Sequence, residues 1–348
     1  MKLLVVSNMY PSQAYPSYGV FVKNFCRGLE VSGIDYDLAV MRRGSNKLQK
    51  LLGYLSFYAG SFFKSLFGSY DLVYVHYASH SSPAVLLARK LRKFRLFTNL
   101  HGSDVVPENP SQEKMQRYTA AAISQSERVI VPSPYFQKLV SEKYGIPMEK
   151  TAVCASGGVD TSVFHKHPAD SNPVFTLGCV GRISAGKGWG TLLDACRLLE
   201  RPYRLLIVGD GPERPQLEAK IRQNNLQDHV TLLPLQPQEK LPHIYSSLDA
   251  FVFPTERAGE SLGLVGLEAM ACGVPVICSN YAAPADYVTE GVNGFQFAVG
   301  DPNALAEAIY RCMDADLDML GANAVKTAAR YEAREVHQTM KRILTGPK

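Results

Sequence analysis

The chain has 348 residues, of which 46% are hydrophobic and 20% are charged, and its net charge is +5. This length exceeds what one hydrophobic core usually organises and suits two domains. The seven cysteines are scattered without a C-x-x-C pair, which argues against a disulfide framework or a zinc site and favours reduced thiols in the cytoplasm. No apolar stretch reaches the roughly 18 residues that a membrane-spanning helix needs.

The charge is distributed unevenly along the chain. Residues 1–160 carry 19 Lys and Arg against 11 Asp and Glu, whereas the remainder carries 18 against 21. A basic first half suits an anionic lipid surface or a phosphorylated acceptor, and it is equally compatible with an ordinary solvated surface.

Short apolar, β-branched runs alternate with segments of helical composition. The predicted strands of the first half are 3–6, 38–41, 72–75, 96–100, 129–131 and 152–154. After the polar, proline-bounded stretch 166–173 the pattern restarts, with predicted strands at 175–180, 205–208, 230–233, 250–253, 274–278 and 294–297. The alternation predicts an α/β protein of two Rossmann-like, doubly wound parallel-sheet domains, 1–165 and 172–329, which face each other across a cleft. We expect a C-terminal helix over 330–348 to pack back on the first domain.

In the first half, His101 and Asp104 come directly after a predicted strand, and Gly102 relieves the turn between them. A histidine followed by glycine at the carboxyl end of a strand is a candidate for the reaction centre. Gly19 opens the helix after the first strand and would let the backbone approach a donor phosphate; a plain helix-entry glycine is an equally good interpretation.

The loop after strand 175–180 contains Arg182 and Lys187 among three glycines. Arginine grips phosphate oxygens in pairs and lysine adds a mobile charge, so the loop suits a diphosphate. It is not a nucleoside triphosphatase loop, because Gly188 stands where that motif has Ser or Thr. A second glycine turn at Gly209 is a weaker candidate for donor contact, and tight backbone packing explains it more often.

The segment 250–280 is the most informative. A buried strand leads to a polar loop that ends at Ser261, and the pattern predicts a helix from about Leu262. The backbone N–H groups of Leu262, Gly263 and Leu264 would then form an anion site at the helix N-terminus. Glu260 and Glu268 are acids in an apolar segment and suit the hydroxyl groups of a sugar and a ribose; a surface salt bridge for each is the simpler alternative.

Taken in order, these segments resemble one family. The motifs are Gly19, H-G-S-D at 101–104, G-G-V-D at 157–160, G-R…K-G at 181–188, V-G-D-G-P at 208–212 and the E-x7-E pair Glu260 and Glu268. The chain is similar to the retaining GT-B glycosyltransferases of family 4 (glycosyl transferases group 1) over residues 2–310. Tyr18 replaces a second glycine that is common beside Gly19, and Gly157 replaces a common asparagine.

The resemblance implies a role for each candidate residue. Arg182 and Lys187 would bind the donor diphosphate and stabilise the leaving group, Glu260 would hold hydroxyls of the transferred sugar, and Glu268 would hold the ribose. Ser261 and the amides of Leu262 to Leu264 would complete the donor cradle, and His101 would lie beside the donor sugar. A UDP-sugar is favoured, with a GDP-sugar second, and the acceptor would be a glycan or a lipid-linked glycan of a bacterial polysaccharide pathway.

No cofactor and no metal ion is expected, since leaving-group stabilisation by the two cations substitutes for a metal. Both Asp-x-Asp sequences, at 35–37 and 314–316, are interpreted as solvated, the first just before a strand and the second within a terminal helix. No aromatic and basic motif for nucleic acid is present. A sugar-nucleotide epimerase and a non-catalytic sugar-nucleotide sensor remain as alternatives.

The segment 47–67 is rich in Leu, Phe and Tyr and carries lysines at 47, 50 and 64. It suits a helix that lies in a membrane interface and brings the enzyme to a lipid-linked acceptor. A buried helix pair whose lysines extend to solvent is the alternative. We favour a cytoplasmic enzyme that binds the inner face of the membrane peripherally.

Overall fold

The computed structural model describes residues 1–15, 18–168 and 172–346. The chain forms two compact units. The first comprises Met1–Gly157 together with Arg334–Lys348, and the second comprises Gly158–Ala333. The division therefore falls after Gly157, earlier than the predicted boundary within 166–173.

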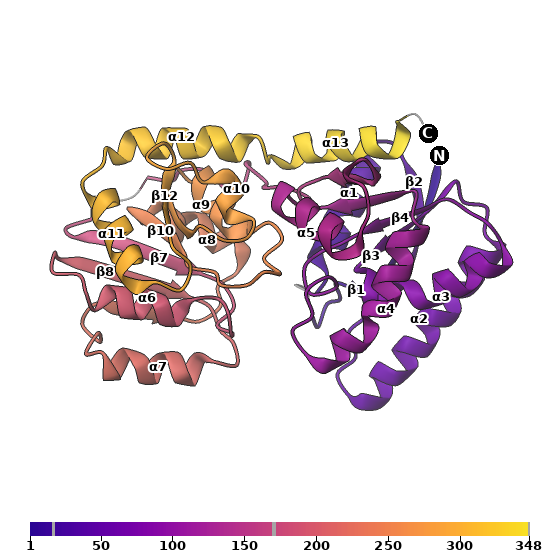
Figure 1. Cartoon of the computed structure of the whole chain (residues 1–348), viewed down its shortest axis with the longest axis horizontal. Coiled ribbons are helices and arrows are strands. Elements are labelled where there is room, and N and C mark those ends of the chain that lie inside the picture. Colours follow the sequence, from indigo (N-terminus) through magenta and orange to yellow (C-terminus); the bar gives the residue numbers. More distant parts are fainter. Residues whose placement is uncertain (16–17, 169–171, 347–348) are drawn as a thin grey trace. The chain divides into compact units, whose positions relative to one another are not determined.

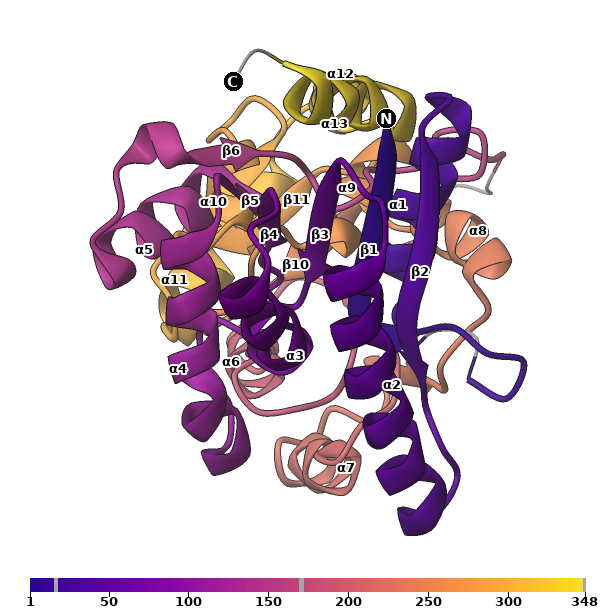
Figure 2. The same ribbon diagram turned by 90° about the vertical axis from the view of Figure 1, so that its right-hand side faces the viewer.

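The first unit is built on a six-stranded parallel sheet with the order β2-β1-β3-β4-β5-β6. Figure 2 shows these strands side by side. The strands are β1 (Lys2–Tyr10), β2 (Asp35–Arg42), β3 (Leu72–His76), β4 (Leu96–Asn99), β5 (Arg128–Val131) and β6 (Thr151–Val153). Its helices are α1 (Val20–Val31), α2 (Lys47–Phe67), α3 (Ala78–Leu91), α4 (Pro110–Gln125), α5 (Pro134–Tyr144) and α13 (Ala333–Thr345), with a short 3-10 turn, η1 (Met148–Lys150).

Helices cover both faces of this sheet, as Figure 1 shows for α2 and α3 on one face and α1 and α13 on the other. On the first face, Phe57 of α2 and Val85 of α3 pack with Val6 and Val75 in one buried cluster. On the opposite face, the ring of Phe25 in α1 stacks on Tyr74 of β3, with 4.4 Å between centroids. Strands buried on both faces explain the near-continuous apolar runs in the sequence.

The second unit repeats the architecture with the order β12-β11-β10-β7-β8-β9. Its strands are β7 (Phe175–Val180), β8 (Tyr203–Val208), β9 (Val230–Leu233), β10 (Ala250–Phe253), β11 (Val276–Ser279) and β12 (Gly294–Phe297). Its helices are α6 (Trp189–Cys196), α7 (Arg214–Gln223), α8 (Leu241–Ser246), α9 (Leu264–Ala271), α10 (Pro284–Tyr287), α11 (Pro302–Met313) and α12 (Leu317–Ala329), with a 3-10 turn, η2 (Gln238–Lys240). The paired strands run parallel throughout.

Two Rossmann-like, doubly wound units were predicted, and the fold class is confirmed. Each of the twelve predicted strands is present, and β7, β9, β10 and β12 have the predicted bounds. The C-terminal helices divide between the units: α11 and α12 belong to the second, and α13 belongs to the first from Arg334 onward.

Candidate functional site

In the second unit, the carboxyl ends of β7 and β10 lie side by side, because β7 pairs with β10 on one edge and with β8 on the other. The direction in which strands are added reverses at this point, and open α/β sheets bind ligands in the loops at such a reversal. Arg182 and Lys187 follow β7, and Glu260 follows β10. The sheet therefore brings together candidates that lie far apart in the sequence.

Lys187 and Glu260 form an ion pair in which Nζ lies 2.6 Å from Oε2, with 23% and 14% of the two side chains exposed. Thr255 Oγ1 donates to the same carboxylate oxygen at 3.4 Å. The backbone also joins the two loops, since the Glu256 amide donates to the Gly186 carbonyl oxygen at 2.8 Å. Glu260 is thus part of a largely buried pair, and its partner is the lysine that the sequence analysis assigned to a diphosphate.

A hollow of about 560 Å³ lies in the same unit, at the ends of β7 and β8 and beside α9. Arg182 and Glu268 both line it, together with Asp210, Gln236 and Gln238. Arg182 is exposed and forms no ion pair with any residue that the structure describes. The volume lies within the roughly 300–1,000 Å³ range of small-molecule sites, so the hollow can accept a nucleotide-sized ligand.

Glu268 projects from α9 and accepts a hydrogen bond from the Tyr245 hydroxyl at 3.1 Å. Burial raises the pKa of Glu268 to about 7, and the hydrogen bond from Tyr245 offsets only part of that rise. The carboxyl group therefore titrates near neutral pH. A ligand hydroxyl that donates to the carboxylate would favour its ionised form.

The predicted start of the helix near Leu262 is wrong, because α9 begins at Leu264. Gly263 precedes it in the left-handed conformation, with φ of 79°. Its left-handed backbone keeps Gly263 outside the helix, and a β-carbon there would lie 2.4 Å from the Phe253 ring. Ser261 and Leu262 lie before the helix, and of the three predicted amides only that of Leu264 belongs to it.

Gly209 follows β8 with φ of 155°, and a β-carbon there would lie 1.9 Å from the carbonyl oxygen of Gly181. The glycine lets the loops after β7 and β8 touch through their backbones. This contact accounts for Gly209 by packing, which was the simpler of the two interpretations of its motif.

In the first unit, the loop after β4 carries His101 and is held by Asp104. Asp104 Oδ1 accepts from the amides of His101 and Gly102, each at 2.9 Å, and Oδ2 accepts from the Ala78 amide at 3.1 Å. Asp104 is fully buried, which raises its pKa to about 6 despite these hydrogen bonds. Burial lowers the pKa of His101 to about 3, so the ring is neutral at physiological pH.

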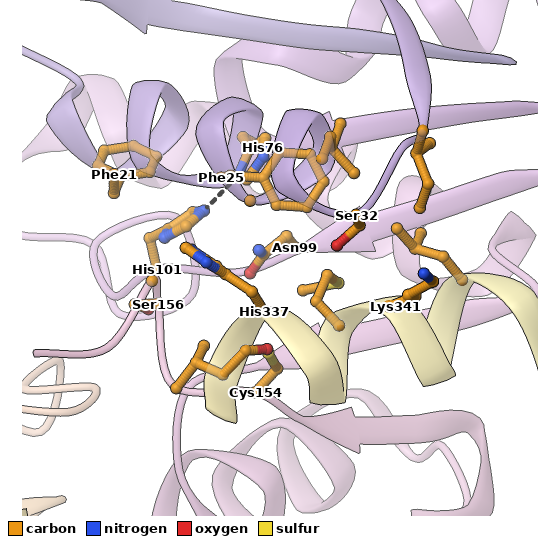
Figure 3. Close-up of a pocket in the computed structure, with 17 residues that line it drawn as sticks. Phe21, Phe25, Ser32, His76, Asn99, His101, Cys154, Ser156, His337 and Lys341 are labelled. Atoms are coloured by element: carbon orange, nitrogen blue, oxygen red, sulfur yellow. Dashed lines mark hydrogen bonds between the residues drawn. The ribbon is translucent and has the colours of Figure 1, made fainter. Parts of the chain in front are cut away.

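Gly19 lies at the start of α1 with φ of 78°, and a β-carbon there would lie 2.6 Å from the backbone carbon of Met9. The glycine therefore lets the first turn of α1 approach the end of β1. Phe21, two residues later, places its ring 4.2 Å from that of His101 (Figure 3). Gly19 and His101 are thus brought to the same edge of the sheet.

His76 was not singled out from the sequence. It is the last residue of β3, only 1% exposed, and its Nδ1 lies 3.0 Å from His101 Nε2 (Figure 3). A polar residue that ends a wholly buried strand was the available signal, since such a group needs a hydrogen-bond partner.

Neither Asp-x-Asp sequence forms a cluster of metal ligands, and the described residues contain no group of three or more His, Cys, Asp or Glu that could hold a metal ion. Asp314 pairs with Arg201, and Asp316 caps α12 by accepting from the Met319 amide. Asp314 and Asp316 lie at helix ends rather than within one helix, and Asp35 and Asp37 lie within β2 rather than before it.

Among the described helices, none has the length and apolar character to cross a membrane.

Two family descriptions match this chain. The family "Glycosyl transferases group 1" matches residues 161–330, and "Glycosyltransferase Family 4" matches residues 19–163. The first match covers nearly all of the second unit and the second match covers most of the first.

Curated relatives are also named as glycosyltransferases. The amylovoran biosynthesis glycosyltransferase AmsK of Erwinia amylovora is 28% identical over 265 residues, which cover 72% of this chain and 63% of that protein. A D-inositol 3-phosphate glycosyltransferase of Corynebacterium urealyticum is 30% identical over 292 residues, which cover 76% of this chain and 68% of that protein. The chain therefore spans about two thirds of the length of these relatives.

Solved structures share the fold over the whole chain. A sucrose-phosphate synthase from Thermosynechococcus elongatus aligns with a TM-score of 0.82 at 22% identity, covering 99% of this chain and 98% of that one. Anabaena HepE in complex with UDP-glucose aligns with a TM-score of 0.77 at 21% identity, covering 100% of both chains. At these identities the likeness establishes the architecture alone.

Proposed function

Because this chain belongs to glycosyltransferase family 4, the glycosyl transferases group 1, we propose that it transfers a hexose from a nucleotide-diphosphate sugar to a glycan or lipid-linked acceptor in bacterial polysaccharide biosynthesis. The observation that carries the proposal is the arrangement at the β7 and β10 ends of the second unit. There Lys187 and Glu260 pair between the two loops, and Arg182 and Glu268 line a hollow of suitable size in the same unit.

Arg182 and Lys187 are proposed to bind the donor diphosphate. Arg182 lines the hollow and is exposed, so its guanidinium can reach an incoming ligand without breaking an ion pair to a described residue. Lys187 is held by Glu260 at 2.6 Å and would exchange this partner, in part, for phosphate oxygens. The two cations would then offset the charge that grows on the departing nucleoside diphosphate.

The two glutamates are proposed to bind hydroxyl groups. Glu260 would accept from hydroxyls of the transferred sugar, and Glu268, which lines the hollow on α9, would accept from the ribose. Ser261 and the amides of Leu262, Gly263 and Leu264 would lie against the sugar and the phosphates. In the first unit, His101 and Gly19 lie at the carboxyl edge of the sheet, where α/β domains bind ligands, and we propose that His101 contacts the transferred sugar.

A UDP-sugar is the favoured donor, with a GDP-sugar second. The UDP-glucose complex of Anabaena HepE supports this choice through the shared fold. Transfer is proposed to retain the anomeric configuration, as in the family that the motifs resemble, and to need no metal ion or other cofactor, because Arg182 and Lys187 supply the positive charge.

Peripheral membrane binding is the proposed route to a lipid-linked acceptor. Six apolar side chains of α2 are exposed by 54% to 73%, and we call them the exposed stripe of α2: Leu48, Leu51, Leu52, Leu55, Phe63 and Phe67. Lys47 and Lys50 stand on the first turn of the same helix. Leucines and phenylalanines with flanking lysines suit the interface of an anionic membrane, and we expect the protein to act there from the cytoplasmic side.

Thermal-shift titration with UDP, GDP, ADP and their sugar conjugates, with and without EDTA, tests the donor site, because a ligand that binds the native state raises its melting temperature. We expect a shift for uridine nucleotides that persists in EDTA and is lost in the Arg182→Ala and Lys187→Ala double variant. Loss of the wild-type shift in EDTA would contradict metal independence.

The reaction itself is tested by following a radiolabelled sugar from the preferred donor. Transfer to an acceptor extract, with little release of free sugar in its absence, is expected of a transferase. Conversion of the donor to a second sugar nucleotide without an acceptor would identify an epimerase instead, and tight donor binding with no turnover under any condition would identify a sensor.

A further inference from the structure

A row of polar side chains, of which all but the part-exposed His101 are buried, lies beneath α1 and α13 in the first unit. It runs from Tyr74 through Asn99 and His76 to His101, and Figure 3 shows the last three in one view. His76 and Asn99 are register partners on neighbouring strands β3 and β4, with 1% and 3% exposure. Polar groups buried this deeply destabilise the fold unless they are hydrogen-bonded. The hydrogen bonds within the row therefore indicate the role of each side chain.

The pair of histidines consists of two neutral rings. Burial and the neighbouring His101 lower the pKa of His76 well below its usual range, and burial lowers the pKa of His101 to about 3. In the 3.0 Å contact between His76 Nδ1 and His101 Nε2, one ring must therefore donate and the other accept. Whether Nδ1 of His76 carries a proton therefore determines whether Nε2 of His101 does.

Asn99 indicates which ring donates. Its Nδ2 donates to the Tyr74 hydroxyl at 3.0 Å, which leaves Oδ1 as the remaining polar atom of the amide. Asn99 Oδ1 and His76 Nε2 have no hydrogen-bond partner in the described part of the chain. Both residues line one cavity of about 20 Å³. An amide oxygen only accepts, so a donor at His76 Nε2 suits the cavity that both residues line, and we assign the proton of His76 to Nε2 and the acceptor role to Nδ1.

We propose that His76 is a positioning residue for His101: it accepts the His101 Nε2–H hydrogen bond and so fixes the tautomer and the ring plane of that histidine. This inference rests on the proposed function, in which His101 contacts the transferred sugar.

Aromatic rings hold the pair in place from α1. Phe25 meets His76 edge-on with 4.6 Å between centroids, and Phe21 lies 4.2 Å from His101. The two phenylalanines are four residues apart and therefore share one helix face. The His101 ring is thus restrained by a hydrogen bond at one nitrogen and by a ring against its face, while Asp104 holds its backbone.

The test compares His76→Leu with His76→Asn. These side chains have nearly the same shape, and only asparagine can accept a hydrogen bond near the former Nδ1 position. Met340→Ala is the control, because Met340 lines the same cavity and its sulfur accepts a hydrogen bond from the Tyr74 hydroxyl. The first readout is the tautomer of His101, from long-range proton–nitrogen spectra of protein labelled with ¹⁵N-histidine, assigned with His101→Gln.

We expect wild-type His101 to be protonated at Nε2, His76→Asn to keep that state, and His76→Leu to mix the two tautomers; Met340→Ala should lower the melting temperature without altering the tautomer. In sugar transfer, His76→Leu should lower kcat by about 10- to 100-fold with little change in donor KM, because misplaced catalytic groups cost rate rather than binding, and His76→Asn should restore most of it.

An Nδ1-protonated His101 in the wild type, or an unchanged tautomer in His76→Leu, would overturn the inference. Equal loss of kcat in the Leu and Asn variants with the tautomer intact would also overturn it, since shape alone would then explain His76. Absence of transfer by the wild type would count against the proposed function only, because the spectra decide the positioning role without turnover.

Discussion

Lys187 and Glu260 stand 73 positions apart in the sequence, yet their side chains meet at 2.6 Å where two loops leave the same sheet. A pair with this little exposure interacts more strongly than a surface pair, and removing one partner strands the other charge. If Lys187 exchanges Glu260 for a diphosphate, the interaction between the two residues must weaken when the donor is bound.

A double-mutant cycle with Lys187→Met and Glu260→Gln measures this exchange. Without ligand, we expect a coupling of about 1–3 kcal/mol in the free energy of unfolding. In the presence of saturating UDP the coupling should fall to less than half of that value. Urea denaturation of the four proteins with and without the nucleotide gives this coupling energy. A coupling energy that is the same with and without UDP would show that Lys187 does not reach the phosphates.

Glu268 predicts a pH dependence of stability. Its pKa is raised to about 7 in the folded protein, so the folded state binds a proton more tightly than the unfolded state does. The stability that Glu268 contributes is therefore fully present below the ordinary glutamate pKa near 4.5 and is lost as the pH rises through 7. Glu268→Gln should gain about 1–3 kcal/mol over the wild type at pH 8 and almost nothing at pH 4.5. Urea titrations at the two pH values check this, and an equal gap at both would contradict it.

The affinity for the donor should change with pH in the opposite direction to stability and increase as the pH rises. Ribose hydroxyls donate to the ionised carboxylate, so the affinity of the wild type for UDP should fall as the pH is lowered from 8 to 6. Calorimetric titration should show a weaker dependence in Glu268→Gln, whose amide does not ionise. A parallel decline in both proteins would assign the effect to another group, such as the phosphate itself.

We expect the addition of one methyl group at Gly188 to lower both stability and donor binding. With φ of 71°, it lies so close to β10 that a β-carbon would fall 1.7 Å from the Pro254 carbonyl oxygen. Gly188→Ala should lower the free energy of unfolding by more than about 2 kcal/mol and weaken donor binding, because the loops of Lys187 and Glu260 would be pushed apart. Gly190→Ala, two residues later in α6 with open space around it, is the matched control and should be neutral or stabilising by up to about 1 kcal/mol.

The exposed stripe of α2 predicts membrane binding without a cost in stability. Replacing Leu51, Leu52 and Leu55 with Gln should abolish co-sedimentation with vesicles of anionic phospholipid and leave the melting temperature within a few degrees. Phe57→Ala, on the buried side of the same helix at 4% exposure, should instead cost about 3–5 kcal/mol while vesicle binding of the folded protein persists. Vesicle binding that survives loss of the three leucines would remove α2 as the contact.

Strands such as β3, β4, β10 and β11 could be predicted because they are wholly buried and therefore apolar, so their local composition carries the signal. The start of α9 could not be predicted to the residue, because the left-handed backbone of Gly263 and its close packing against Phe253 appear only in three dimensions. The same holds for Glu260, whose partner no local pattern indicates. For His76, a polar residue at the end of a buried strand, the sequence signals the need for a partner but does not identify His101. The roles assigned to Arg182, Lys187, Glu260, Glu268 and His101 stay predictions.

The helix α13 has a consequence for the order in which the protein is made. Val336, Met340 and Leu344 are buried in the first unit, and Met340 receives the hydrogen bond of the Tyr74 hydroxyl. The ribosome synthesises all of the second unit before these residues. During that time α13 does not yet cover the face of the first unit around Phe25 and Tyr74. The unit made first is therefore the unit finished last, and a fragment that stops at Gly157 should be prone to aggregate.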